Sequence, residues 1–259
     1  MMQASRLRLR GKLPLITRTK FGEARVTNLL NTKYQCPYRP ATFYSMASTT
    51  NTPRNSQLKY LLVLDFEATC GDAVMQKEII EFPTLVYNIE EDKVQATFHE
   101  YVKPTDTPTL TKFCTDLTGI TQDTVDAADT FPAVWSRFEE FLKTHGFMED
   151  FDSHAFATYG NWDLKTMLPK QLQQSSSEHG LDASGNLIPP YNRWINIKIA
   201  SRKHYKQRYN RGMDGTLKML KMELEGRHHS GIDDCKNIVR IIQRMRSDGW
   251  VPKVVDTDM

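Results

Sequence analysis

Hydrophobic and polar positions between residues 58 and 250 follow two periods, one typical of strands and one typical of helices. Residues 60–67 form a nearly unbroken apolar run, as expected of a central strand buried on both faces. Residues 78–89 and 94–103 predict two more strands, and the polar turn between them predicts an antiparallel hairpin. A further short strand is expected over residues 155–159.

The helical pattern follows these strands. Residues 130–143 place apolar side chains on one helical face, with a proline in the first turn. Further helices are expected from Trp162 onward, over residues 216–224 and, most regularly, over residues 233–246. A strand hairpin followed by strand–helix alternation predicts an α/β fold with a mixed sheet. Neither GxGxxG nor GxxxxGK[ST] occurs, so no motif supports a nucleotide-cofactor site or a P-loop.

Charge divides the chain into two parts. The first 59 residues hold eleven Lys and Arg against one acidic residue, a net charge of +10, while the other 200 residues carry −7. Such a basic, Ser/Thr-rich segment is typical of an organelle transit peptide, although a disordered basic arm that binds nucleic acid, or an alternative start at Met46, would also explain it. We expect residues 1–56 to be this leader, residues 57–259 to be the folded domain, and the location to be organellar or cytoplasmic. No apolar run is long enough for a membrane-spanning helix, so no membrane contact is expected.

Carboxylates stand at the ends of two predicted strands. Asp65 and Glu67 are two residues apart, a spacing that directs both side chains of a strand to the same face. Two carboxylates side by side near a core repel each other and lose hydration unless cations lie between them. Asp163 lies at a strand-to-helix turn, where α/β sheets usually bind ligands, although a lone aspartate there is more often a helix cap.

The third acidic motif has two possible registers. A histidine precedes an aspartate by five residues twice, as His228 with Asp233 and as His229 with Asp234. Helical periodicity places Asp234 on the apolar face with Ile238, whereas Asp233 points to solvent or caps the helix. We therefore expect His229 to be the functional partner of Asp234, and His228 to be a bystander.

Four inward carboxylates beside one histidine have a direct chemical use. Mg²⁺ prefers oxygen ligands, and two such ions about 3.5–4 Å apart clamp the attacking and leaving oxygens of a phosphodiester. A neutral imidazole beside them can take a proton from the attacking water. Zinc would be expected to recruit cysteines or more histidines, and the spacing of the sequence offers none.

A basic segment over residues 193–211 provides a second candidate for phosphate contacts. It contains seven Lys and Arg and no acidic residue, and aromatic side chains are interleaved with the charges. Arg202, Lys203 and Lys206 are the candidates for contacts with the nucleic-acid backbone, next to aromatic rings that can stack on bases. The alternative is an ordinary solvated basic face. Positive charge concentrated in an otherwise acidic domain would steer a polyanion toward the metal site.

In their order along the chain, the motifs resemble the DEDDh superfamily of 3′-to-5′ exonucleases: Asp65-x-Glu67, Asp163 and His229-x₄-Asp234. Residues 78–83, 113–121 and 194–197 are similar to the enhanced-RNAi exoribonuclease family, which includes the 3′ histone-mRNA exonuclease. The resemblance covers about residues 58–250. It implies an RNase H-like exonuclease fold, with a five-stranded mixed sheet flanked by helices.

The resemblance also implies residue roles. The ligands of two Mg²⁺ or Mn²⁺ ions would be Asp65, Glu67, Asp163 and Asp234, with His229 as general base. The residues around the 3′-terminal nucleotide would be Ala68, Thr69, Leu117, Thr118 and Trp162. Some family members carry an N-terminal SAP-type nucleic-acid module. The basic segment here does not resemble one, so stem-loop specificity that depends on it is not implied.

The implied activity is metal-dependent 3′-to-5′ exoribonuclease action on RNA with a free 3′ end, single-stranded or with a short overhang. It would release nucleoside 5′-monophosphates in RNA 3′-end trimming or in small-RNA or ribosomal-RNA processing. The motifs alone do not separate RNA from DNA, so a 3′-to-5′ DNA exonuclease is one alternative. A non-catalytic RNA-binding adaptor on the same fold is the other.

Overall fold

The structure is a computed structural model, and it describes residues 58–72, 74 and 76–254. Contacts divide the chain into residues 1–52 and residues 53–259, and all described residues belong to the second unit. The leader expected over residues 1–56 and the alternative start at Met46 lie outside the described residues. Within the described part, no helix has both the length and the apolar character needed to cross a membrane.

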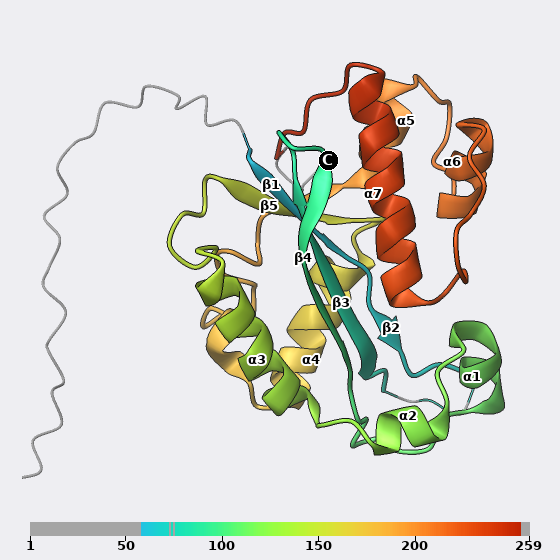
Figure 1. The fold of residues 1–259 in the computed structure, drawn as a ribbon. Helices are drawn as coiled ribbons and strands as arrows, with labels where there is room; N and C mark the ends of the chain where they lie inside the picture. The colour runs from blue at the N-terminus through green and yellow to red at the C-terminus, as the bar shows by residue number, and fades with distance from the viewer. Residues whose placement is uncertain (1–57, 73, 75, 255–259) are drawn as a thin grey trace, which may run out of the picture. The chain divides into compact units, whose positions relative to one another are not determined.

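The described strands form one mixed sheet (Figure 1): β1 (Tyr60–Leu64), β2 (Glu67–Ala68), β3 (Ile79–Asn88), β4 (Lys93–Tyr101), β5 (His154–Thr158) and β6 (Trp194–Asn196). Strands β3 and β4 form the predicted antiparallel hairpin, whereas β1, β5 and β6 run parallel to one another. Both β1 and β2 pair with β3, so together they make one interrupted strand. The order is therefore β4–β3–β1/β2–β5–β6, so the six strands of the described residues occupy five positions, and the expected five-stranded mixed sheet is met when β1 and β2 count as one strand.

The interruption of this strand differs from the continuous strand predicted over residues 60–67. The chain leaves the ladder at Asp65 and Phe66 and pairs with β3 again at Glu67, where the register shifts. The backbone N–H of Phe66 donates instead to Oδ1 of Asp163, at 2.9 Å. The strand breaks because a side chain from another element replaces its ladder partner.

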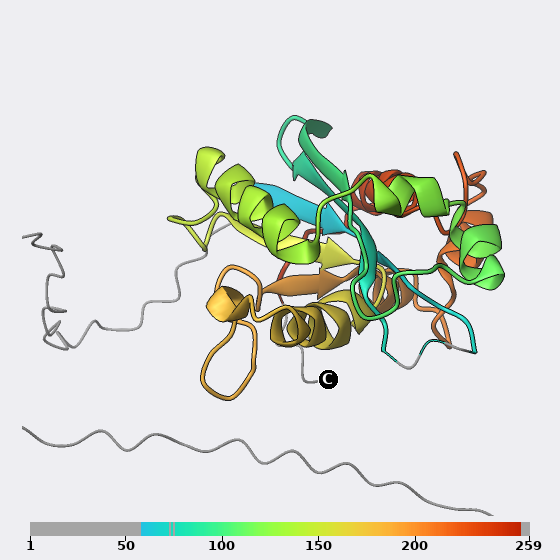
Figure 2. The same ribbon diagram turned by 90° about the horizontal axis from the view of Figure 1, so that it is seen from below.

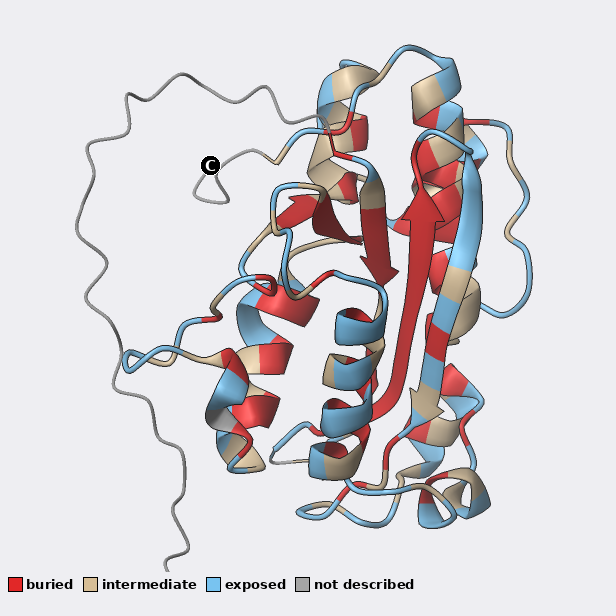
Figure 3. Cartoon of the chain, turned by 60° about the vertical axis from the view of Figure 1, so that its left-hand side comes forward, coloured by how far each residue is buried: buried red, intermediate tan, exposed pale blue. Residues whose placement is uncertain are grey.

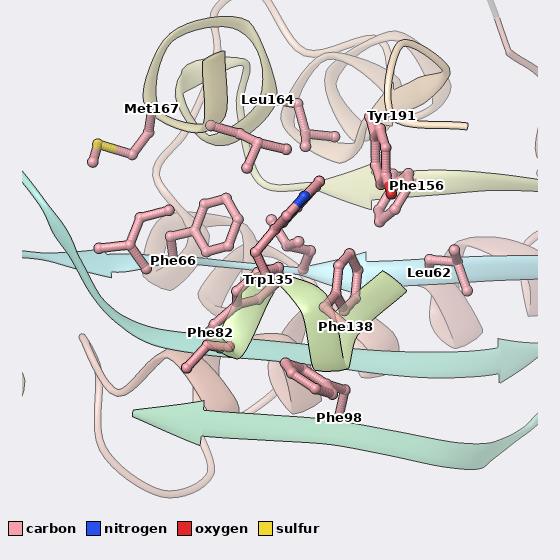
Figure 4. Packing of buried hydrophobic residues seen from close by; sticks show 14 of the residues in the cluster. Leu62, Phe66, Phe82, Phe98, Trp135, Phe138, Phe156, Leu164, Met167 and Tyr191 are labelled. Atoms are coloured by element: carbon pink, nitrogen blue, oxygen red, sulfur yellow. The ribbon is translucent and has the colours of Figure 1, made fainter. Parts of the chain in front are cut away.

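The unbroken apolar run of β1 is explained by helices on both faces of the sheet. Leu62 and Leu64 face a cluster formed with α3 (Phe131–Thr144) and α4 (Leu168–Gln174), whereas Leu61 and Val63 face a second cluster. Around Phe82, the first cluster is rich in aromatic rings (Figure 4). The helices on the opposite face are α5 (Ile197–His204), α6 (Met213–Met219) and α7 (Gly231–Ser247).

Burial differs sharply between neighbouring strands. Every residue of β3 is buried, while most of β4, at the edge of the sheet, is exposed or half-buried (Figure 3). Helix α7 packs against β3 and β1. The most regular helix predicted from the sequence therefore covers the centre of the sheet, next to the strand that carries the first carboxylate motif.

Two short helices lie side by side at one end of the sheet, α1 (Lys112–Thr118) and α2 (Gln122–Asp126) (Figures 1 and 2). In each, a threonine caps the first turn: the Thr111 hydroxyl accepts the N–H of Cys114, and the Thr121 hydroxyl accepts that of Thr124. Hydrophobic periodicity did not predict these helices, because each has fewer than two full turns. It also missed β6 and α5.

Two predicted helices differ in their bounds or type. The helix expected from Trp162 begins there as a π-helix (Trp162–Met167) and continues as α4. The helix expected over residues 216–224 begins earlier, at Met213, and ends at Met219. Beyond that point the chain turns, and Lys221 adopts a left-handed backbone conformation.

Candidate active site

The predicted carboxylates meet at the end of the sheet where β1 stops and α7 begins. Oxygens of Asp65, Glu67 and Asp234 all lie within 4.8 Å of one another. Asp163 lies just outside this group, in the first turn of the π-helix after β5. Its hydrogen bond to the N–H of Phe66, the residue between Asp65 and Glu67, holds it against the same edge. The structure thus brings together the four carboxylates that the sequence singled out.

Hydrogen bonds between Asn161 and strand β6 fix the turn that carries Asp163. Asn161 lies two residues before Asp163. Its Oδ1 accepts hydrogen bonds from Nε1 of Trp194 at 3.2 Å and from Nδ2 of Asn196 at 2.8 Å. Both donors belong to β6, the neighbour of β5. Asn161 therefore ties the turn that carries Trp162 and Asp163 to the adjacent strand.

Burial raises the pKa values of these carboxyl groups, and repulsion within the cluster adds to the effect for Asp65 and Glu67. Loss of hydration is the largest cause in each case. It raises the pKa of Glu67 to about 9, that of Asp234 to about 7 and that of Asp163 to about 6. The pKa of Asp65 also lies well above its ordinary value, through burial and then repulsion by Asp163, Asp234 and Glu67. Without a cation, the cluster holds protons that ordinary carboxyl groups lose far below neutral pH.

The hydrogen bonding of Asp234 shows whether a metal ion fits these residues. The residue is 3% exposed, and its Oδ2 accepts the backbone N–H of His229 at 2.9 Å. Its Oδ1 is buried with no hydrogen-bond partner among the described residues. An unpaired buried carboxylate oxygen is unfavourable, and carboxylate oxygens are the ligands that hard divalent cations prefer. The donor set of Asp65, Glu67 and Asp234 therefore fits a divalent cation.

The helical register expected from periodicity is confirmed. Asp234 lies on the buried face of α7 with Ile238, and Asp233 is half-buried. Asp233 Oδ2 accepts the backbone N–H of Arg227 at 3.0 Å, so it ties down the turn before the helix. Asp233 was expected to face solvent or to cap the helix, and it instead binds a residue of the turn before the helix.

His229 lies beside Asp234 with an unusual backbone. Its φ of 64° is in the left-handed region, and burial, followed by the nearby His228 and Arg227, lowers its pKa. The imidazole is therefore neutral at neutral pH, the form that can accept a proton. His228, which was expected to be a bystander, lies close to the same group. Its ring stacks on that of His229 with 4.0 Å between centroids, and both histidines have a ring nitrogen within 4.8 Å of an Asp234 oxygen.

Glu81 of β3 anchors the start of α7, and the sequence reasoning did not assign it a role. The N-cap residue Ser230 makes no side-chain cap. Instead the Glu81 carboxylate, 1% exposed, accepts two N–H groups of the first turn, those of Gly231 at 2.8 Å and Ile232 at 3.1 Å. Its Oε1 also lies 2.8 Å from Nε2 of His99. The sequence feature that could have indicated this role is an acidic residue within the apolar run of β3.

This anchor presses α7 against the first carboxylate motif. A Cβ atom on Gly231 would lie 2.6 Å from the backbone oxygen of Asp65, a contact that real side chains do not tolerate. Glycine at this position is thus required by the close approach of two backbones. Glu81 and Gly231 together fix the distance between Asp65 and Asp234.

Arg227 connects the histidine segment to α1. Its guanidinium donates to the backbone oxygens of Asp116 and Leu117, and it fills the space where a Cβ on Gly119 would lie, 2.9 Å from Nε. Gly119 also has a φ of 80°, as the last turn of α1 requires. No sequence pattern indicated this contact, because the two segments are about 110 residues apart.

The residues expected around the terminal nucleotide differ in exposure. Ala68 and Thr69 directly follow Glu67 and are buried, and the Thr69 hydroxyl accepts the N–H of Glu78. Thr118 is also buried, and its hydroxyl donates to the backbone of its own helix. Their backbones are also engaged within the fold: the N–H of Thr69 donates to the carbonyl of Glu78 at 2.8 Å, and the carbonyl of Ala68 accepts the thiol of Cys114.

Trp162 and Leu117 are more accessible. Trp162 is 39% exposed, and Nζ of Lys77 lies 5.7 Å from its ring centroid. Leu117 is half-buried on α1, the helix that Arg227 ties to the histidine segment. An exposed indole next to Asp163 offers a surface on which a base can stack.

The three basic candidates are not brought to the carboxylates. Arg202 and Lys203 lie in the last turn of α5, and Lys206 follows it. Tyr205 donates to Oδ2 of Asp248, the residue that ends α7. Asp248 is fourteen residues beyond Asp234, about 21 Å along the helix. In Figure 1, α5 accordingly lies beside the end of α7 that is remote from β2.

Comparisons with known proteins agree with this geometry. The model of the exonuclease family matches residues 62–242. ERI1 exoribonuclease 3 of Homo sapiens is 39% identical over 210 residues, covering 81% of this chain and 60% of that protein. For 3′-5′ exoribonuclease 1 of Mus musculus, the identity is 38% over 199 residues, covering 75% of this chain and 55% of that protein. The chain thus spans somewhat more than half the length of these curated relatives.

A solved structure gives the same result. The nuclease domain of 3′hExo, a DEDDh family member bound to rAMP, is 35% identical and superposes with a TM-score of 0.66. The match covers 76% of this chain and 98% of that domain. Since the family model spans most of the folded unit, the chain belongs to the exonuclease family.

Proposed function

We propose that this protein is a metal-dependent 3′-to-5′ exoribonuclease that hydrolyses the last phosphodiester of RNA and releases nucleoside 5′-monophosphates. The observation that carries the proposal is the Asp65–Glu67–Asp234 cluster beside a neutral His229, with a buried Asp234 oxygen that has no partner in the described part of the chain. Relatives named as exoribonucleases support RNA as the substrate, and the solved relative bound to rAMP supports a nucleotide product.

The acidic residues would hold the metal. Asp65, Glu67, Asp163 and Asp234 would bind two Mg²⁺ or Mn²⁺ ions, since both ions favour carboxylate oxygens. When bound, such ions activate a water and offset the charge that develops on the scissile phosphate. Asp234 would serve a second purpose, because its other oxygen fixes the backbone of His229.

His229 would take the proton from the attacking water. Its lowered pKa keeps the imidazole neutral at neutral pH, and its backbone is held by Asp234 on one side and by the Glu81-anchored helix on the other. A general base at a fixed position accelerates such a step by about 10²–10⁴-fold.

The RNA would contact the protein in two places. The terminal base would stack near Trp162 and Leu117, with the backbone of Ala68 and Thr69 at the sugar. The preceding nucleotides would follow the basic segment toward Arg202, Lys203 and Lys206. Tyr159, after β5, bonds to the backbone of Arg211 and Gly212, so this segment returns from α5 to the edge of the sheet that carries Asp163.

Matched oligonucleotides test the proposal. RNA and DNA of one sequence, with a free 3′-hydroxyl or a 3′-phosphate, would be incubated with the full chain and Mg²⁺, and the products identified by chromatography. We expect nucleoside 5′-monophosphates from RNA with a free 3′ end, at a higher rate than from DNA. Faster degradation of DNA would indicate a DNA exonuclease instead. Tight RNA binding without any cleavage would favour the adaptor.

A further inference from the structure

His228 adds a second imidazole to the edge of the carboxylate cluster. Ring nitrogens of His228 and His229 and an oxygen of Asp234 lie within 4.8 Å of one another. His228 is exposed, whereas Asp234 is buried with Oδ1 unpartnered among the described residues. This group of three shares only Asp234 with the all-oxygen group that includes Asp65 and Glu67.

The backbone explains why the two adjacent histidines face the same place. Neighbouring side chains of an extended segment point to opposite sides. His229 instead has a φ of 64°, and the two rings stack at 4.0 Å with only 20° between their planes. The spacing of residues in the sequence argued against zinc, because it could not show this left-handed turn.

Two imidazole nitrogens and one carboxylate form a different donor set from that of the magnesium site. Zn²⁺ binds histidine nitrogen at about 2.0–2.1 Å and takes three protein ligands with one open position in many sites. Mg²⁺ avoids nitrogen ligands, whereas zinc and similar transition metals favour them. Because His228 is exposed, its ring can turn to direct a nitrogen toward an ion that His229 and Asp234 also bind.

We infer that His228, His229 and Asp234 form a transition-metal site that binds Zn²⁺ and, when occupied, inhibits the nuclease. An ion held there engages the imidazole that would otherwise accept the proton, and it engages a ligand of the magnesium site. The zinc site stands on the placement of these three side chains. The inhibition rests on the proposed function.

Zinc binding is measured first, independently of any activity. The full chain, in excess Mg²⁺, competes for Zn²⁺ with a chromophoric chelator, beside His228→Gln and the control His145→Gln, which changes an exposed histidine at the end of α3. We expect His145→Gln to match the unmodified chain and His228→Gln to bind zinc at least about tenfold more weakly, since one of three ligands is lost. Equal affinity in all three proteins would overturn the site.

X-ray absorption at the zinc edge then counts the imidazole ligands. Two are expected in the unmodified chain and in His145→Gln, and one in His228→Gln. A single imidazole in every protein would contradict the proposal, because His228 would then not be a ligand.

RNA degradation at fixed Mg²⁺ tests the inhibition, with each variant compared with its own zinc-free rate. We expect the zinc concentration that halves the rate to rise at least about tenfold in His228→Gln. Equal inhibition of both proteins would overturn the inhibitory role. Zinc bound through two imidazoles by a chain that degrades no RNA even without zinc would instead refute the proposed nuclease and leave the site intact.

Discussion

Glu81 and Asp234 are carboxylates buried to nearly the same degree, yet their surroundings differ. Glu81 is 1% exposed and faces three donors: two backbone N–H groups of α7 and the ring of His99. Asp234 is 3% exposed, receives one N–H on Oδ2 and has no partner for Oδ1 among the described residues. The two lie on elements that pack together, and Glu81 is one source of the repulsion that raises the pKa of Asp234.

Glu78, the residue just before β3, repeats the satisfied arrangement. It is 3% exposed, and its oxygens accept the N–H groups of Thr105, Asp106 and Thr107. Burial alone therefore does not distinguish a structural carboxylate from one that awaits a ligand. The number of hydrogen-bond donors around the carboxylate distinguishes them, because a buried carboxylate that the fold leaves unpaired is stabilised only by a bound ligand.

The largest expected effect comes from removing the unpaired carboxylate. Asp234→Asn should abolish RNA degradation, with a rate at least about 10³-fold lower, because a metal ligand is lost. The free energy of unfolding without metal should not fall, since repulsion among Asp65, Glu67 and Asp234 is relieved. Steady-state kinetics and chemical denaturation measure both quantities. Asp116→Asn, at an exposed position of α1, is the matched control. Full activity in Asp234→Asn would refute the assignment of the ligands.

His229→Ala should slow the reaction by about 10²–10⁴-fold and leave metal binding nearly unchanged, because only the proton acceptor is removed. Single-turnover rates and calorimetric titration with Mg²⁺, which avoids nitrogen ligands, separate the two effects. His228→Ala, measured alongside in metal-free reagents with added Mg²⁺, should reduce the rate much less. An equal loss in both variants would show that the register of the histidine motif was assigned wrongly.

Parallel substitutions at Glu81 and Glu78 test whether a well-paired buried carboxylate also positions the metal site. Glu81→Gln and Glu78→Gln each place an amide against backbone donors, so each should lower the free energy of unfolding by about 1–3 kcal/mol. Only Glu81→Gln should also raise the Mg²⁺ concentration needed for half-maximal activity, by about 10–100-fold, because Glu81 sets the position of the helix that carries Asp234. If the two variants shift the Mg²⁺ dependence equally, Glu81 has no positioning role.

The basic segment should affect binding more than chemistry. Replacing Arg202, Lys203 and Lys206 together by Gln should raise KM several-fold and leave kcat nearly unchanged, since these residues lie at the end of α5 that is tied to Asp248, the end of α7 remote from Asp234. Each lost phosphate contact should reduce the slope of log affinity against log salt by about 0.7. An unaltered salt dependence of RNA binding would show that this surface does not contact the substrate.

The smallest effect is on the stability of the metal-free protein. Glu67 and Asp234 have pKa values raised to about 9 and about 7, so between about pH 4.5 and these values the folded chain holds protons that the unfolded chain has lost. Stability should therefore fall as pH rises, by at least about 2 kcal/mol from pH 6 to pH 9. Saturating Mg²⁺ should remove most of this dependence in denaturation curves. A flat profile without metal would contradict the raised pKa values of these two carboxyl groups.

Local pattern was enough to predict the strands that carry the site and the face of α7 that carries Asp234. Asp163 was predicted correctly to lie near Asp65 and Glu67, because the ends of adjacent parallel strands meet at one edge of a sheet. The break after Leu64 was not predictable, since it depends on a hydrogen bond between residues 97 positions apart.

Contacts between distant segments account for what sequence reasoning missed. Glu81 caps a helix 150 residues away, and Arg227 binds α1 across 110 residues. Helix α5 points its basic end away from the carboxylates. The number of charged residues in a segment does not indicate which way its helix points, so this position was not predictable. His228 joined the site through a single left-handed residue, which no residue-type pattern in the motif indicated.

The proposal depends most on the claim that the carboxylate cluster of Asp65, Glu67 and Asp234 holds the metal needed to remove nucleotides from a 3′ end. The most direct measurement follows 5′-labelled RNA with a free 3′-hydroxyl on a sequencing gel, with the unmodified chain in Mg²⁺, the same chain in EDTA, and Asp234→Asn in Mg²⁺. We predict a ladder that shortens stepwise from the 3′ end with the unmodified chain in Mg²⁺, and no shortening in the other two reactions. Shortening that persists in EDTA or in Asp234→Asn would contradict it.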